Sequence, residues 1–248
     1  YDKVKVPVYI LSGWQDGYKN PVPRVVSGMA AAGKTASGMI GPWGHNSPDG
    51  GYPGPRMNWL PYMMTQLWDT WLKGKSPDPK ATLPQLTVWL GESREPGDSP
   101  DFDEQGRWVA EDAEWETRVV PCPLYPRPDG TMAVDAPTEK GCITLSPRVI
   151  VNANQLETSS YGQSGNADLP GDQQPADTLS LRFTSEPLVE DMDCFGRPSV
   201  LLNLMCDKPL ASLVVRLSEV SPTTGAAHQI SYTFHNLCRQ DGDMAHPV

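Results

Sequence analysis

The 248-residue sequence contains no apolar run near the ~18 residues that a membrane-spanning helix requires. It shows neither a recognisable signal peptide nor a basic amphipathic stretch suited to an anionic membrane. Positive charge is also scarce: 20 Lys and Arg stand against 30 Asp and Glu, for a formal net charge of −10. Because nucleic-acid-binding surfaces are usually basic, the sequence predicts no nucleic-acid partner and no membrane partner.

Cysteine is sparse and unpaired. The cysteines show no CxxC spacing, so the sequence predicts neither a zinc site nor a thiol redox motif. We expect isolated, reduced cysteines that are mostly buried, since scattered free cysteines usually behave as small apolar side chains. A disulfide framework is the alternative, which the spacing does not favour. The five residues are Cys122, Cys142, Cys194, Cys206 and Cys238.

Patterns for metals and cofactors are missing as well. The stretch DMDCFG (Asp191–Gly196) begins like a calcium loop, but Phe195 replaces a ligand and Leu202 stands where the closing Glu belongs. No glycine-rich phosphate-binding loop occurs. We therefore predict no metal and no cofactor. The remaining histidines lack metal-ligand spacing and are expected in surface or packing roles: His228, His235 and His246.

The first 80 residues alternate strand patterns with helix patterns. The apolar run VPVYIL (Val6–Leu11) predicts a strand that is covered on both faces, and residues 37–45 predict the next one. Residues 20–33 predict a helix with Asn20 as cap, Pro21 in the first turn and Gly33 as stop. A second helix is predicted over residues 58–74, ending before Gly74. Its expected buried face contains Leu60, Met63, Met64, Leu67 and Trp71.

From about Ala81 onward, short strand patterns replace helical periodicity. Turn signals punctuate these patterns, and together they predict an all-β sandwich, a jelly roll in the first instance. Residues 152–177 are polar and rich in Gly and Pro, so we expect one long, exposed surface loop there. The expected strands cover residues 85–91, 106–111, 115–121, 141–146, 178–183, 199–205, 212–220 and 228–237.

Asp16 and His45 follow two predicted strands that are separated by one helix. A strand–helix–strand order implies a parallel sheet, whose functional sites lie at the carboxyl ends of strands. Taken alone, Asp16-Gly17 is a tight-turn signal, and a single histidine after GPWG is more often structural than catalytic. Taken together, an acid followed by a histidine fits the last two members of the Ser–Asp–His order of α/β-hydrolases. In that chemistry a carboxylate orients the imidazole that accepts the serine proton.

Two motifs around these residues resemble those of the CocE/NonD hydrolases, a family that includes cocaine esterase, α-amino-acid ester hydrolases, glutaryl acylases and the related X-Pro dipeptidyl-peptidases. They are VPVYILSGWQDGY (Val6–Tyr18) and IGPWGHNSP (Ile40–Pro48). Further similar pieces continue in family order over nearly the whole chain: QLWDTWLKG at 66–74, LTVWLGE at 86–92, Trp108 with Trp115, PGDQQ at 170–174, residues 183–200, SLVVRLSEV at 212–220 and HNLCRQ at 235–240.

The resemblance implies the site. Asp16 is similar to the triad acid and His45 to the base that it holds. Tyr18 matches an aromatic position that lines the acyl pocket in some members, with a packed loop tyrosine as the alternative. Trp14 and Trp43 are expected to wall the site and exclude water. The expected partner is a small-molecule ester, amide or peptide substrate, and the oligomeric state stays open.

The nucleophile of that family is absent from this sequence. Family members carry it as Gly-x-Ser-Tyr-x-Gly, and no such segment occurs among the 248 residues. The stretch SSYGQSG (Ser159–Gly165) contains Ser-Tyr-Gly, but it lacks the glycine two places before Ser160 and follows His45 in the chain. We interpret it as a chance match in a loop.

These observations predict α/β plus all-β architecture. Residues 1–80 are assigned to the C-terminal part of an α/β-hydrolase domain, and residues 81–248 to an incomplete jelly roll like the C-terminal domain of X-Pro dipeptidyl-peptidases. The sequence is expected to be a fragment of a serine hydrolase that acts through an acyl-serine intermediate, inactive by itself because it lacks the serine. The alternative is a non-catalytic β-sandwich module for binding or structure, with a degenerate hydrolase remnant.

Overall fold

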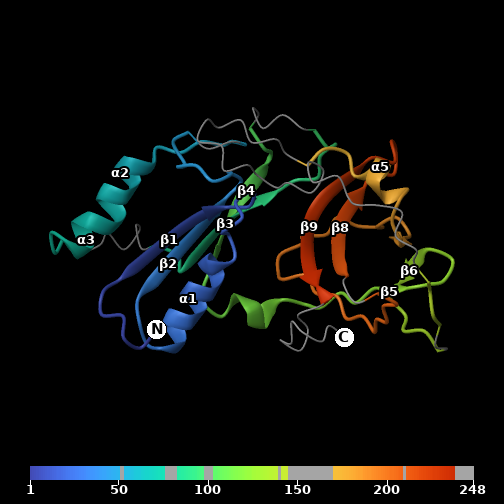
Figure 1. Cartoon of the computed structure of the whole chain (residues 1–248). Coiled ribbons are helices and arrows are strands. Elements are labelled where there is room, and N and C mark those ends of the chain that lie inside the picture. Colours follow the sequence, from blue (N-terminus) through green and yellow to red (C-terminus); the bar gives the residue numbers. More distant parts are fainter. Residues whose placement is uncertain are drawn as a thin grey trace.

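The computed structural model describes residues 1–50, 53–75, 83–97, 103–138, 141–144, 170–208 and 211–237. Two lobes lie side by side (Figure 1). We call the first lobe the sheet β1–β4 with the helices around it, and the second lobe the strands β5–β9 with helix α5. Among the described residues, no helix is both long and apolar enough to cross a bilayer.

The first lobe is built on a four-stranded sheet in the order β1-β2-β3-β4. The first three strands are parallel and β4 runs antiparallel to β3, so Trp108 faces Trp89 across the last pair. A run of parallel strands confirms the strand–helix–strand pattern of the sequence. The strands are β1 (Val8–Gly13), β2 (Ala36–Gly41), β3 (Leu86–Gly91) and β4 (Gly106–Glu111).

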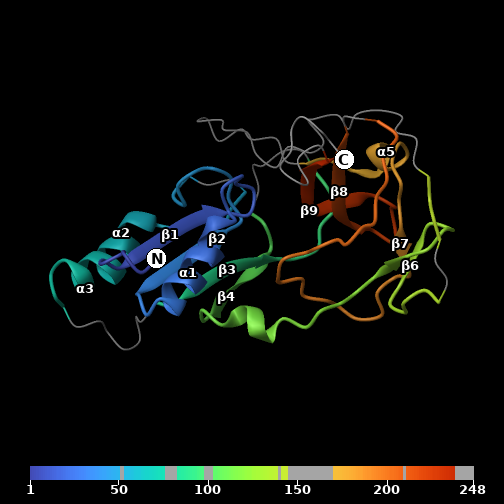
Figure 2. The same cartoon turned by 60° about the horizontal axis from the view of Figure 1, so that its bottom comes forward.

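Helix α1 (Pro21–Ala31) covers one face of this sheet (Figure 2). Its buried residues are Val22, Val26 and Met29. The helix lies close to β2 at Gly38, where an added Cβ would lie only 2.8 Å from a methyl of Val22. The core of the first lobe consists of Val22, Val26, Ile40, Leu86, Val88 and Trp115.

Of the two predicted ends of α1, the C-terminal one has the expected feature and the N-terminal one does not. Gly33 has a φ of +65°, the left-handed conformation that favours glycine after a helix, as predicted. Asn20 makes no side-chain capping bond, so the expected cap is wrong. Asn20 itself has helical backbone angles, φ −59° and ψ −30°, whereas a capping residue normally lies outside the helical region.

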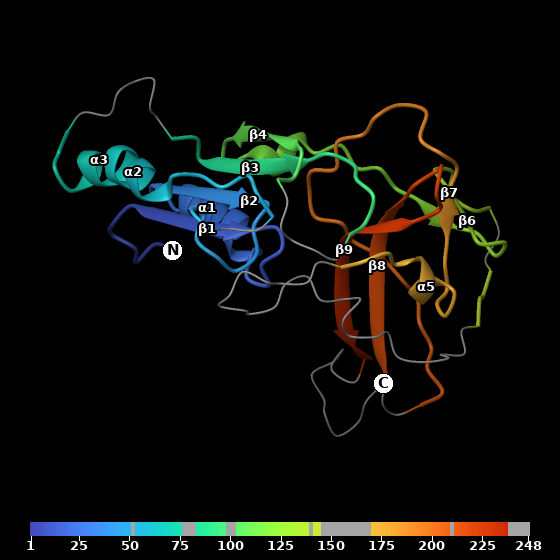
Figure 3. The same ribbon diagram turned by 90° about the horizontal axis from the view of Figure 1, so that it is seen from above.

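The second predicted helix is present as α2 (Trp59–Met63), a π-helical turn (Met64–Trp68) and α3 (Asp69–Trp71). Gly74, with φ +63°, follows it as expected. The expected burial of its apolar face is wrong. The segment projects from the end of the molecule opposite to β8 and β9 (Figure 3), and within the described part of the chain its apolar stripe is exposed. That stripe contains Leu60, Met64, Trp68, Trp71 and Leu72.

The second lobe contains a three-stranded sheet in the order β5-β6-β7 and the hairpin β8–β9. The lobe is rich in strands, but its described residues do not close a barrel, and the eight strands of a jelly roll are not all formed there. Its elements are β5 (Tyr125–Pro126), β6 (Thr131–Ala133), α5 (Gln174–Asp177), β7 (Thr184–Ser185), β8 (Ser212–Val220) and β9 (Ala227–Asn236).

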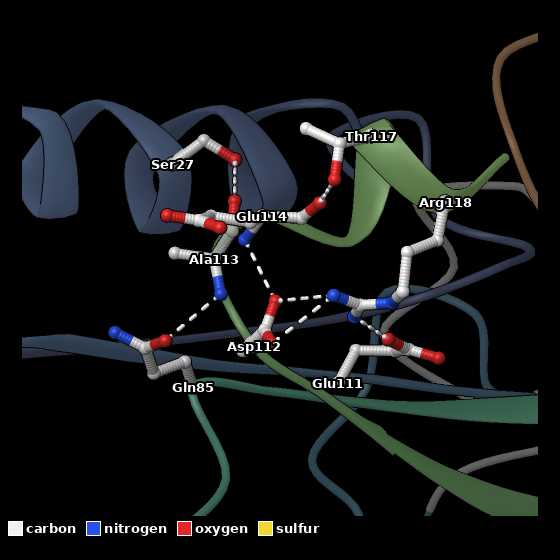
Figure 4. A network of polar contacts seen from close by, with 8 residues as sticks. All are labelled: Ser27, Gln85, Glu111, Asp112, Ala113, Glu114, Thr117 and Arg118. Atoms are coloured by element: carbon white, nitrogen blue, oxygen red, sulfur yellow. Dashed lines mark hydrogen bonds and ion pairs between the residues drawn. The ribbon is translucent and has the colours of Figure 1, made fainter.

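Several predicted strands are absent for local reasons. Residues 115–118 form a 3₁₀ turn instead of a strand. A polar network fixes the curled backbone before it (Figure 4): Asp112 accepts from the backbone N–H of Glu114 at 2.8 Å and from Arg118 at 3.1 Å. Ser27 of α1 donates to the carbonyl of Ala113 at 3.3 Å, which ties the turn to the helix. The curl places Trp115 in the core of the first lobe.

Other expected strands are also missing from the described residues. Residues 178–183 form a turn and irregular chain, and residues 199–205 are irregular; both have the apolar composition of a strand without forming one. Residues 141–144 are irregular too, and the rest of that predicted strand lies outside the described residues.

The predicted surface loop 152–177 is corrected at its C-terminal end. Gln173 is fully buried, and α5 begins at the next residue. The amide oxygen of Gln173 accepts from Arg216 of β8, and Asp177 pairs with the same guanidinium. A composition-based argument missed this polar anchor. Residues 152–169, including Ser160, lie outside the described residues.

The cysteine prediction is half right. Four cysteines are free, as expected for reduced residues, but all four are exposed rather than buried: Cys122, Cys142, Cys194 and Cys206. Cys238 lies outside the described residues. The four residues lie in irregular segments, and Cys194 is exposed although its neighbour Phe195 packs against the core of the first lobe.

The expected boundary between residues 80 and 81 falls between β2 and β3, which are neighbours in one sheet. The two strands pair from Gly38 with Leu86 to Ile40 with Val88. The β3–β4 pair is therefore a physical part of the first lobe, and it leads toward the second lobe.

Candidate active site

Main-chain hydrogen bonds join the two turns that follow β1 and β2. The backbone N–H of Trp14 donates to the carbonyl of Gly41 at 2.8 Å, and that of Gln15 donates to the carbonyl of Trp43 at 3.1 Å. Gly13 permits this approach, because a Cβ there would lie 1.8 Å from the Trp43 carbonyl oxygen. Both turns therefore have fixed positions at the carboxyl end of the sheet.

Asp16 and His45 meet at this end. The Nδ1 atom of His45 lies 3.0 Å from Oδ2 of Asp16, as the sequence predicted. Asp16 is buried, with 6% of its surface exposed, whereas half of the His45 side chain is exposed. A carboxylate oxygen can only accept, so Nδ1 carries the hydrogen in this contact. The Nε2 atom is then the basic nitrogen of the ring.

Asp16 also forms the turn in which it lies. Its Oδ1 atom accepts from the backbone N–H of Tyr18 at 2.8 Å, an Asx-type bond. The turn is not a hairpin, because β1 is parallel to β2 and α1 follows the turn. Gly17 does not have the positive φ that a type I′ hairpin turn requires. The hairpin interpretation of Asp16-Gly17 is therefore wrong, and Asp16 both shapes its own turn and contacts His45.

Two further polar groups surround the acid, and the sequence reasoning missed both. The hydroxyl of Ser12, the fifth residue of β1, donates to Oδ2 of Asp16 at 3.0 Å. The ammonium of Lys19 donates to the carbonyl of Trp14 at 2.8 Å. Burial lowers the pKa of Lys19, and the charge of Asp16 opposes that shift. Ser12 lies four residues before the acid, inside a strand, and this position alone gives no specific sign of the contact.

The three predicted aromatic residues have different positions. Trp43 is buried and donates from its indole to the carbonyl of Pro55 at 2.9 Å. Trp14 donates from its indole to the carbonyl of Trp89 at 2.6 Å. Both indoles thus brace the turns. Tyr18 is largely exposed, and its ring lies 5.6 Å from that of His45 in an edge-on arrangement.

The described residues hold no group of three or more His, Cys, Asp and Glu side chains arranged for a metal ion. His228 and His235 both lie in β9, away from Asp16 and His45. His246 lies outside the described residues.

The chain from β3 onward is rich in strands, and a comparison with protein families gives this region a class. The family described as the X-Pro dipeptidyl-peptidase C-terminal non-catalytic domain matches residues 80–248. This match covers more than half of the chain, so the chain belongs to that family. It supports the wider CocE, NonD and X-Pro dipeptidyl-peptidase group without distinguishing a member. No match was found among curated proteins or solved structures.

Proposed function

We propose that this chain supplies the acid and the base of a serine-hydrolase triad. Asp16 is the acid, His45 is the base, and the attacking serine comes from a segment other than these 248 residues. The observation that carries the proposal is the 3.0 Å contact between Asp16 and His45 at the ends of adjacent parallel strands. Sites in parallel sheets lie at this edge.

The contact supports a defined sequence of proton transfers. Asp16 keeps the Nδ1 hydrogen of His45 in place and stabilises the imidazolium when it forms. The Nε2 atom takes the proton of the serine hydroxyl as that oxygen attacks the substrate carbonyl, and returns it to the leaving alcohol or amine. Water repeats the cycle on the acyl-serine. Half of the His45 side chain is exposed to solvent.

The family region takes a supporting role in this proposal. Residues 80–248 form no acid–base pair of their own in the proposed mechanism, in keeping with the non-catalytic description of the family. Their strand β3 receives the indole hydrogen bond of Trp14 and so braces the turn that carries Asp16. The proposed substrates are esters, amides or the peptides that X-Pro dipeptidyl-peptidases cleave.

A second candidate is a non-catalytic module for binding or structure, with a hydrolase remnant. The family description and the missing serine motif favour it. The ordered bonds around Asp16 argue against it, because a remnant has no need for a buried carboxylate aimed at a histidine.

The first experiment reads the coding sequence upstream of Tyr1. A Gly-x-Ser-Tyr-x-Gly segment supports the hydrolase, and a start codon close to Tyr1 with no such segment favours the module. The second measures p-nitrophenyl ester hydrolysis by the full-length protein. His45→Ala is expected to abolish turnover, whereas His235→Ala, in β9, keeps it. The 248-residue chain alone is expected to match a His45→Ala control. Wild-type turnover by full-length His45→Ala overturns the proposal.

A further inference from the structure

We propose that Ser12 is a positioning residue for Asp16, a role that rests on the proposed function. Its hydroxyl donates to Oδ2 of Asp16 at 3.0 Å, the same oxygen that faces Nδ1 of His45 at 3.0 Å. The carboxylate thus receives two donors on one oxygen and the Tyr18 N–H on the other, at 2.8 Å.

These three donors come from three separate parts of the first lobe. Ser12 belongs to β1 and pairs with Ile40 of β2, so the sheet fixes its backbone. Tyr18 belongs to the turn after β1, and His45 to the turn after β2. Two side-chain torsions set the orientation of the Asp16 carboxylate, and donors on both of its oxygens favour a single orientation. Without Ser12, no strand-borne donor contacts Oδ2 among the hydrogen bonds of the described residues.

The Ser12 hydroxyl also stabilises the negative charge on Oδ2 of Asp16, the oxygen that contacts His45. A carboxylate oxygen has lone pairs for both the hydroxyl and the imidazole N–H. Both Ser12 and Asp16 are buried, at 8% and 6% exposure, so water does not readily replace a lost donor. A lost donor to a buried charge is costly for this reason. Ser12→Ala is therefore expected to let Asp16 rotate and loosen its hold on Nδ1.

A purely structural serine gives a different result. Ser27 of α1 is a matched control, because it also donates one hydrogen bond from the first lobe, to the carbonyl of Ala113, without contacting Asp16. If Ser12 only stabilises the fold, Ser12→Ala and Ser27→Ala have the same kind of effect. If it positions Asp16, only Ser12→Ala changes the state of the His45 ring.

The test uses the full-length protein and two readouts. Imidazole ¹⁵N resonances report which nitrogen of His45 carries the hydrogen. The wild type and Ser27→Ala are expected to show the Nδ1–H form, and Ser12→Ala a mixture of tautomers. In ester hydrolysis, Ser12→Ala is expected to lower kcat about tenfold with KM nearly unchanged. Ser12→Thr, which keeps the hydroxyl on a residue suited to strands, restores both readouts.

Unchanged His45 resonances in a folded Ser12→Ala protein overturn the proposal, as do equal changes in Ser27→Ala. The nitrogen resonances need no turnover. If the full-length protein hydrolyses no substrate, the proposed function fails, and the resonances still decide the role of Ser12. Denaturant unfolding of each variant shows whether it is folded. If Ser12→Ala does not fold, Ser12→Cys, with a weaker donor in nearly the same volume, replaces it with the same expected mixture.

Discussion

The indole N–H of Trp14 donates a hydrogen bond of 2.6 Å to the carbonyl oxygen of Trp89, which lies 75 residues later in β3. Pairing between β2 and β3 stops at Ile40 and Val88, so this bond forms one residue beyond the last strand pair. It joins the turn that carries Asp16 to a strand of the family region. The region described as non-catalytic is therefore in direct contact with the candidate site.

Trp14→Phe is expected to weaken this connection while keeping an aromatic side chain at this position. One partly buried hydrogen bond disappears, and the free energy of unfolding falls by about 1 kcal/mol. The turn carrying Asp16 loses its link to β3, so ester hydrolysis by the full-length protein is expected to fall several-fold. Trp68→Phe, on the exposed stripe of the second helical segment, is the control. Equal activity of Trp14→Phe and Trp68→Phe contradicts a bracing role for Trp14.

Gly13→Ala is expected to separate Asp16 from His45. The added Cβ meets the Trp43 carbonyl oxygen at 1.8 Å, so the two turns must move apart. Gly17→Ala is a close control, because a Cβ there meets nothing within 4 Å and the residue has no positive φ. Hydrolysis and thermal unfolding of the two variants distinguish them. A Gly13→Ala protein with wild-type activity contradicts the described contact between the turns.

Asp16→Asn is expected to keep the shape of the site and lose a factor on the order of 10⁴ in kcat. The amide nitrogen donates where the carboxylate accepted, which favours the wrong imidazole tautomer. Asp49→Asn changes a carboxylate that also accepts a backbone N–H, from Trp59, and is expected to keep its activity. Comparing kcat for the two variants tests whether the charge of Asp16 acts through His45. If kcat of Asp16→Asn falls less than tenfold, Asp16 is only a turn residue and not the acid of a triad.

The first lobe was largely predictable because its signals are local. Apolar runs place β1 and β2, Pro21 and Gly33 delimit α1, and the strand ends bring Asp16 close to His45. Ser12 was not predictable, since a serine in a strand gives no sign of what its hydroxyl contacts. The sharing of β3 by both regions was also invisible, because a strand pattern does not specify its partners.

The segments after β4 were less predictable because their conformation depends on contacts that a strand pattern does not reveal. Residues 115–118 contain the branched and aromatic residues of a strand, yet the bonds of Asp112 and the burial of Trp115 form a turn. Gln173 is polar and close to Gly and Pro, so composition places it on the surface. The Arg216 guanidinium, 43 residues away, supplies the partner that permits its burial.

His228 provides a test of the junction between the lobes. It is the second residue of β9 and lies opposite Glu219 of β8, whose carboxylate accepts a hydrogen bond from Ser93. Burial, with repulsion from Arg94, lowers the pKa of His228 from 6.5 to about 4. Burial raises the pKa of Glu104, and Arg94 opposes that change. The histidine is therefore neutral at the folded junction over a range in which it is charged in the unfolded chain.

This depressed pKa predicts a loss of stability on acidification. Between pH 6.5 and about 4 the unfolded chain binds a proton at His228 that the folded protein does not, so the free energy of unfolding falls as pH falls and levels off below pH 4. Solvent screening of a partly exposed ring reduces the effect to about 1–2 kcal/mol. The raised pKa of Glu104 has the opposite effect on the free energy of unfolding, so a variant is needed to isolate the contribution of His228.

The measurement compares His228→Gln with the wild type by denaturant unfolding at pH 7.5 and pH 4.5. The variant is expected to lose less stability on acidification, whereas His235→Gln, exposed in the same strand, loses as much as the wild type. Equal losses of unfolding free energy in all three proteins contradict a lowered pKa of His228 in the folded protein.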